Sequence, residues 1–191
     1  MNKRVKVMTI LLAAGLGACA SVEPTAVSVP DRIRPGANES LAAVVPAKGV
    51  QIYECREAKG HPGTYEWAFV APDAMLFDSH GIRIGKHYAG PHWESNDSSK
   101  VVAALKDRAD APVAGAIPWL LLTAKSVGPE GSFSKVTSIV RANTVGGIAP
   151  RSGCSQAAAG TSARVEYTAD YYFYDVKSTT RPAAYNTGSR Y

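Results

Sequence analysis

An alternation of apolar and polar side chains with a period of two is the feature of this sequence that most constrains its fold. The clearest run spans residues 164–173, where Val165, Tyr167, Tyr171 and Phe173 are among the apolar or aromatic side chains at alternate positions. A strand with one buried and one solvated face has this period, whereas a helix repeats every 3.6 residues. The run therefore predicts a half-buried β-strand.

Shorter segments repeat this pattern, and residues that favour turns separate them. The predicted strands are 50–55, 64–70, 82–88, 119–125 and 133–143. The predicted turns, rich in Gly and Pro, are 61–63, 79–81, 128–131 and 146–147.

One further segment, residues 98–108, fits a helix or a strand, and we favour a strand. Seven or eight short strands with no convincing helix predict an all-β, single-domain fold. We expect an antiparallel β-sandwich or a partly closed barrel.

The amino-terminal segment has the form of a lipoprotein signal peptide. Lys3, Arg4 and Lys6 precede an uncharged apolar run that ends at Ala18 and is too short for a transmembrane helix. Leu16-Gly17-Ala18-Cys19 resembles the lipobox of bacterial lipoproteins, in which a lipid-modified cysteine follows small residues at the cleavage site. The alternative is an ordinary secretory signal cut at a nearby small residue.

Lipidation of Cys19 would anchor the mature chain to a membrane. Ala20 follows, where an aspartate would favour the inner membrane, so we expect the periplasmic side of the outer membrane. The predicted organisation is a signal peptide (1–18), a lipidated tether (19–40), a β-rich domain (41–176) and a disordered tail (177–191).

Removal of the signal peptide changes the charge of the chain. The sequence has 21 Lys and Arg against 16 Asp and Glu, a formal net charge of +5. Three of these basic residues lie within 1–18, so 18 remain against 16 and the net charge falls to +2. Because nucleic-acid binding needs clustered basic residues on one face, and the body of the chain has no such cluster, we expect no nucleic-acid partner.

The three cysteines divide between two roles. If Cys19 carries lipid, Cys55 and Cys154 remain, and an exported domain folds in an oxidising compartment. We predict a disulfide between them, the alternative being two independent buried thiols. Neither has a Cys or His at the short spacing of a zinc site, so no metal is predicted.

The densest group of chemically capable residues lies between Asp78 and Glu94, and includes His80, His87 and His92. General acid–base catalysis needs a histidine or a carboxylate held in a cleft. We therefore select His87, Asp78 and Glu94 as candidate catalytic or binding residues. The alternative for His87 is a structural role, with its ring hydrogen-bonded to a backbone carbonyl.

Two tryptophans are predicted to lie in different environments. Trp119 lies in the apolar run 117–122 and is predicted to be core. Trp93 follows a Gly-Pro turn amid polar residues, so we place it at a surface cleft as a fourth candidate binding residue.

Several motifs in order resemble the domain-of-unknown-function family numbered 3455. They are Gly49-Val50-Gln51-Ile52-Tyr53-Glu54-Cys55, Trp67 with Ala71-Pro72, the run from Gly85 to Glu94, Ala116-Ile117-Pro118-Trp119-Leu120-Leu121, and Thr144-Val145-Gly146-Gly147 with Cys154. The resemblance implies an exported β-rich domain of bacteria and fungi and carries no activity. His87 keeps its place in the family pattern, whereas His92 departs from it.

The leading hypothesis is a non-enzymatic envelope lipoprotein that binds a ligand or partner near His87 and Trp93. The alternative is a cofactor-free, hydrolase-like enzyme using His87 with Asp78 or Glu94. A structural protein without a small-molecule site is third. The sequence contains no Gly-x-Ser-x-Gly elbow, Walker loop or Gly-x-Gly-x-x-Gly motif, which disfavours nucleotide-dependent enzymes, and no cofactor is predicted.

Overall fold

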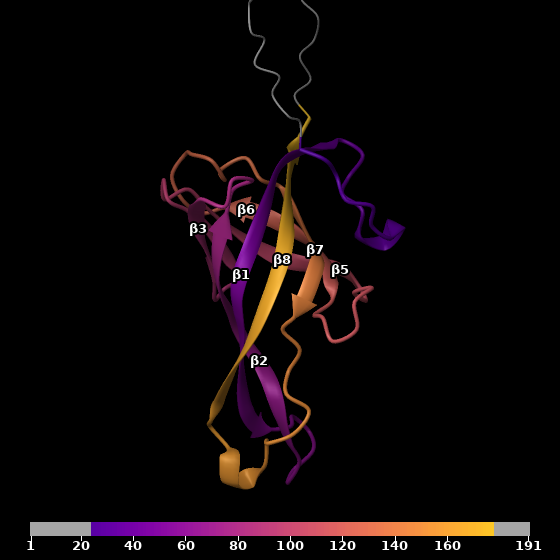
Figure 1. Cartoon of the computed structure of the whole chain (residues 1–191), viewed down its shortest axis with the longest axis vertical. Helices are drawn as coiled ribbons and strands as arrows, with labels where there is room; N and C mark the ends of the chain where they lie inside the picture. Colours follow the sequence, from indigo (N-terminus) through magenta and orange to yellow (C-terminus); the bar gives the residue numbers. More distant parts are fainter. Residues whose placement is uncertain (1–23, 178–191) are drawn as a thin grey trace, which may run out of the picture.

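A closed antiparallel β-barrel forms the body of the protein (Figure 1), seen in a computed structural model that describes residues 24–177. The strands are β1 (Glu39–Glu57), β2 (Tyr65–Phe77), β3 (Arg83–Tyr88), β4 (His92–Ser95), β5 (Lys100–Ala109), β6 (Trp119–Ser126), β7 (Ser138–Gly146) and β8 (Ser162–Val176). Each strand pairs with the next in sequence, and β8 pairs with β1. The prediction of an antiparallel all-β fold is confirmed, and the barrel is the architecture observed.

Most of the predicted strands are present, with different lengths. The ambiguous segment 98–108 is confirmed as a strand, β5. The strand predicted at 133–143 begins later, at Ser138, because residues 133–136 form a turn closed by the bond from Val136 N to Phe133 O. Strand β4 was not predicted, and β1 begins at Glu39, two residues before the expected start of the domain.

The barrel interior is filled by alternate side chains from its strands, as the period of two requires. The buried cluster inside consists of Val45, Ala47, Ala74, Leu76, Trp93, Val101, Ala103, Ile117, Leu122, Phe133, Val136, Ile139, Tyr167, Ala169, Tyr171 and Phe173. The run used above to predict a strand is therefore the inner face of β8.

A second apolar cluster lies outside the barrel, beneath the amino-terminal segment. Its buried members are Ile33, Trp119, Leu121, Val140, Ala142, Tyr172 and Tyr174. Ile33 belongs to the short 3-10 helix η1 (Asp31–Ile33), and Arg32 in the same turn pairs with Asp107 of β5 at 2.9 Å. Residues 24–38, within the range predicted as a tether, thus include a segment packed on the barrel. The core position of Trp119 is confirmed.

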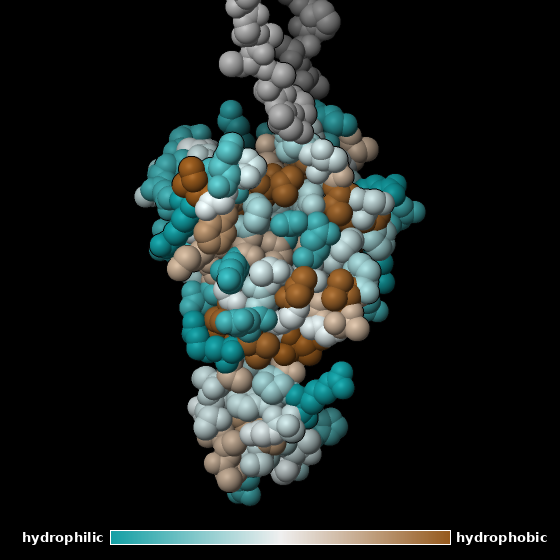
Figure 2. All heavy atoms as spheres, viewed as in Figure 1, coloured by the Kyte–Doolittle hydropathy of each residue, from teal (hydrophilic) through white to brown (hydrophobic). Residues whose placement is uncertain are grey.

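Strands β1, β2 and β8 continue beyond the barrel as an arm, which forms the narrow lower part of Figure 1. β2 pairs with β3 only over its last residues, from Ala74 to Phe77, so residues 65–73 pair with β1 alone. Figure 2 shows hydrophobic residues gathered where the barrel meets the arm.

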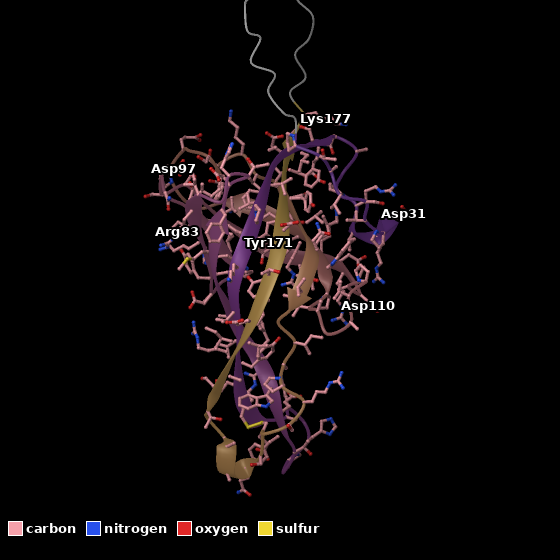
Figure 3. All side chains as sticks on the ribbon, viewed as in Figure 1. Asp31, Arg83, Asp97, Asp110, Tyr171 and Lys177 are labelled. Atoms are coloured by element: carbon pink, nitrogen blue, oxygen red, sulfur yellow. A yellow bond between two sulfur atoms is a disulfide. The ribbon has the colours of Figure 1, made fainter. Side chains whose placement is uncertain are left out.

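A disulfide between Cys55 and Cys154 staples the tip of the arm, as predicted. It joins the end of β1 to the loop between β7 and β8, which carries a second 3-10 helix, η2 (Gln156–Ala158), and it spans 99 residues of sequence. The bond is visible at the bottom of Figure 3.

Glycines let neighbouring strands approach closely at two points of the barrel. A Cβ added to Gly49 of β1 would lie 2.2 Å from the carbonyl oxygen of Asp73, and one on Gly85 of β3 would lie 2.3 Å from that of Glu94. Such glycines allow the sheet to bend enough to close.

The predicted signal peptide, Cys19 and the predicted tail from residue 178 onward lie outside the described residues. Within residues 24–177, no helix is long and apolar enough to cross a membrane.

Candidate functional site

A cavity of about 180 Å³ lies inside the barrel, at the end nearest the turn between β3 and β4. All eight strands contribute to its wall. The lining residues are Gln51, Phe69, Pro72, His87, Pro91, Trp93, Leu105, Leu120, Leu122, Arg141 and Tyr171. Phe69 and Leu105 are each more than half exposed, so they form the rim, whereas Tyr171 is fully buried at the middle of β8 (Figure 3).

His87 lies in this wall between two aromatic rings. Its imidazole stacks on the indole of Trp93, with ring centroids 4.0 Å apart, and meets Tyr171 edge-on at 5.2 Å. His87 Nδ1 lies 2.8 Å from the backbone oxygen of His92. Because a carbonyl only accepts, Nδ1 carries the proton, and Nε2 of the neutral ring is an acceptor.

Burial keeps this imidazole neutral. Desolvation, the largest effect, and the charge of Arg141 together lower the pKa of His87 to about 3, against the opposing effect of the bond to the His92 carbonyl. His87 is therefore uncharged throughout the physiological range.

Three buried side-chain donors have no hydrogen-bond partner among the described residues: Gln51 Nε2 and Trp93 Nε1, whose residues line the cavity, and Trp119 Nε1, which belongs to the second apolar cluster. Gln51 is 2% exposed and Trp93 is 1% exposed. A buried polar group without a partner costs about 1–3 kcal/mol, so native proteins rarely retain one without a reason.

Arg141 supplies a positive charge to the same wall. Its Nε and Nη2 donate to the backbone oxygen of Pro118 at 3.2 and 2.8 Å. Within residues 24–177, no carboxylate lies at ion-pair distance from Arg141, and no Asp or Glu lines the cavity. The cavity is thus rich in donors and electropositive at one side, with apolar side chains over the rest.

Only two of the four residues selected from the sequence come together here. His87 and Trp93 are opposite each other in the register of β3 and β4. The surface position predicted for Trp93 is wrong, because alternation along β4 turns the indole into the barrel and its outward neighbours are His92 and Glu94.

Asp78 lies in the turn before β3, at the opposite end of the barrel from the cavity. Its Oδ1 accepts hydrogen bonds from the backbone N–H groups of His80 and Ile82, both at 2.9 Å. These bonds, led by that from Ile82, lower the pKa of the Asp78 carboxyl. The carboxylate stabilises a turn and does not contact His87.

Glu94 lies on the outer face of the barrel, one position after Trp93. It is opposite Lys86 and Lys100 in the two neighbouring strands, with ion pairs of 3.2 and 3.6 Å. Tyr88 Oη donates to Glu94 Oε2 at 2.5 Å, which raises the pKa of Tyr88 to about 12 and lowers that of Glu94. Glu94 and His87 lie on opposite faces of the sheet, so His87 does not pair with the Glu94 carboxylate.

Sequence reasoning missed Gln51 and Arg141. Both are polar residues in register with side chains that point into the barrel: Ala47, four residues before Gln51, and Ile139, two residues before Arg141. A polar residue in the apolar register was the available signal. Among the described residues, no group of three His, Cys, Asp or Glu side chains could hold a metal ion.

Comparison with family models gives one match. The model described as "Protein of unknown function (DUF3455)" matches residues 35–175, which covers all eight strands of the barrel except the last residue of β8. The chain belongs to this family. The resemblance inferred from the sequence motifs is thereby confirmed, and the family description assigns no activity. Neither a curated protein nor a solved structure matches the chain.

Proposed function

We propose that this protein is a lipid-anchored envelope protein whose barrel binds a small ligand in the cavity beside His87 and Trp93. The observation that carries the proposal is a cavity lined by two residues, Gln51 and Trp93, whose side-chain donors Nε2 and Nε1 are buried and unpartnered. A ligand oxygen that accepts from one of these donors would remove the cost of leaving that donor unpaired.

The size of the cavity favours one small molecule. An apolar cavity of about 150 Å³ engineered into another protein binds benzene. A volume of about 180 Å³ accommodates a ring-sized molecule with a small polar group. Leu105, Leu120 and Leu122 supply the apolar contact, and the polar groups fix the orientation.

Binding fits the site better than hydrolysis does. A general base is most effective with a pKa near the operating pH, and a pKa of about 3 makes His87 a weak base. Asp78 and Glu94, the carboxylates considered as its partners, lie at the other end and on the other face of the barrel.

The proposed anchor is a lipid on Cys19, with the domain on the periplasmic side of the outer membrane. The lipobox-like residues 16–19 support this anchor and location. The disulfide supports export, because disulfides persist in oxidising compartments. With Cys19→Ala, we expect the protein to move from the membrane fraction to the soluble fraction; continued recovery with membranes would contradict the anchor.

Ligand binding is tested through the indole N–H signals of the three tryptophans in an NMR titration with benzyl alcohol. We expect the Trp93 signal to shift to saturation. The Trp67 signal is the internal control, because Trp67 Nε1 donates to Ser152 O at 2.9 Å on the arm. Absence of a Trp93 shift with millimolar benzyl alcohol and with its carboxylate and amide analogues, benzoate and benzamide, or an equal shift of Trp67, would overturn the proposal.

A further inference from the structure

We infer that the ligand is a small organic carboxylate with a ring-sized apolar body, and that its carboxylate binds Arg141. This inference rests on the proposed ligand-binding function and specifies the chemistry of the same site. Three features carry it: the charge of Arg141, the excess of donors, and the apolar remainder of the wall.

The charge of Arg141 is only partly compensated. Two of its N–H groups share the backbone oxygen of Pro118, the guanidinium also donates to the Tyr171 hydroxyl, and no carboxylate among the described residues pairs with it. A partly buried charge is costly unless it is paired. A guanidinium has five donors in a planar fork that matches a carboxylate.

The balance of donors and acceptors favours an anion over a neutral polar group. Gln51 Nε2 and Trp93 Nε1 have no acceptor, and the Arg141 guanidinium adds further N–H donors to the same wall. An ionised carboxylate is acceptor-only and offers about four lone-pair sites, so it can serve several donors at once. An alcohol or amide offers fewer acceptor sites and brings donors of its own.

The apolar side chains of the cavity wall favour an organic anion over an inorganic one. A phosphate has no apolar surface, so it would make no apolar contact with the lining residues Phe69, Pro72, Leu105, Leu120 and Leu122. A molecule of the size of benzoate places one oxygen pair at Arg141 and a ring against these side chains. The cavity, at about 180 Å³, is large enough for such a ring.

Benzoate and benzamide distinguish charge from shape, because they are nearly isosteric and only benzoate is an anion. We measure the dissociation constant of each from the Trp93 indole signal of the full chain. We expect benzoate to bind at least about tenfold more tightly than benzamide, equivalent to about 1.4 kcal/mol. In Arg141→Gln the ratio of the benzamide dissociation constant to the benzoate dissociation constant should fall to about one.

The matched control is Arg164→Gln, which removes an arginine from the outer face of β8 where it pairs with Asp73 at 2.6 Å. It should retain the full preference for benzoate. Should Arg141→Gln fail to fold, the wild-type protein still provides a test: the Arg141 Nε–H signal should shift with benzoate and not with benzamide.

The outcomes distinguish failure of the inferred carboxylate chemistry from failure of the proposed binding function. Equal affinity for benzoate and benzamide, or a preference that survives Arg141→Gln, would overturn the inference and leave the proposed binding function intact. Failure of benzoate, benzamide and benzyl alcohol alike to shift the Trp93 signal would overturn both.

Discussion

The imidazole of His87 lies parallel to the indole of Trp93, with an interplanar angle of 15° and ring centroids 4.0 Å apart. The two residues are direct partners across β3 and β4, and both side chains are almost fully buried. This stack forms one wall of the cavity, with the edge of Tyr171 against it. It places a neutral imidazole and an unpartnered indole donor side by side at the cavity.

The buried His87 should make stability depend on pH above the range where carboxylates titrate. In the unfolded chain the imidazole takes up a proton below about pH 6.5, whereas in the folded protein its pKa of about 3 keeps it neutral. The unfolded state therefore binds more protons between these values, and the free energy of unfolding falls as the pH decreases. We expect a loss of about 2 kcal/mol between pH 7 and pH 5.

Urea denaturation of His87→Gln at both pH values tests this expectation. The variant should lose most of the pH dependence, and His61→Gln, in an exposed loop, should keep it. The pKa values of Glu39, Glu94 and Asp97 are lowered, so their stabilising contributions are lost only at more acidic pH. An unchanged pH dependence in His87→Gln would show that another group is responsible.

Gln51→Leu should stabilise the free protein by about 1 kcal/mol, because it removes a buried donor that has no partner. The midpoint of urea unfolding measures the change. Arg56→Leu, an exposed position on the same strand, is the control and should alter stability by less than about 0.5 kcal/mol. Destabilisation by Gln51→Leu would mean that the amide makes contacts that stabilise the barrel.

Loss of the disulfide should lower stability by about 2–4 kcal/mol, because it closes a long loop in the unfolded chain. Thermal unfolding of the double variant Cys55→Ser, Cys154→Ser measures this effect. Reduction of the wild-type protein should lower the Tm similarly, and reductant should have no further effect on the double variant. Equal melting temperatures for the oxidised and reduced wild-type protein would contradict a stabilising role.

Gly49→Ala should destabilise the barrel by about 1–3 kcal/mol or more, because the added Cβ meets the backbone of β2 rather than a movable side chain. Gly63→Ala is the control, because it replaces a glycine with alanine without the clash expected at Gly49. Its Cβ has open space, although its φ of +79° makes alanine mildly unfavourable. A larger decrease in Tm for Gly63→Ala than for Gly49→Ala would argue against close strand contact at Gly49.

The strands were predictable where side-chain alternation was long enough to read. Residues 164–173 revealed β8, because one face fills the barrel and the other is partly solvated. Strand β4 has only four residues, too few for a period to be evident. The arm also obscured the pattern: a register shift occurs between Ile52 and Tyr53, and Phe69, an aromatic residue of the strand predicted at 64–70, is more than half exposed.

Half of the candidate site was predictable, and the reason lies in strand geometry. His87 and Trp93 come together because the turn at residues 89–91 sets their register. Glu94 is adjacent to Trp93 in sequence, yet it points to the opposite face. Arg141 and Gln51 come from β7 and β1, and only closure of the barrel brings these strands to the same cavity.

The most direct test of the central claim is a crystal structure of the protein grown with benzyl alcohol. We expect density for the ring against Leu120 and Leu122, with its hydroxyl within hydrogen-bond distance of Trp93 Nε1 or Gln51 Nε2. A cavity closed by rearranged side chains, or a probe bound only on the outer surface of the barrel, would contradict the assignment of this cavity as the binding site.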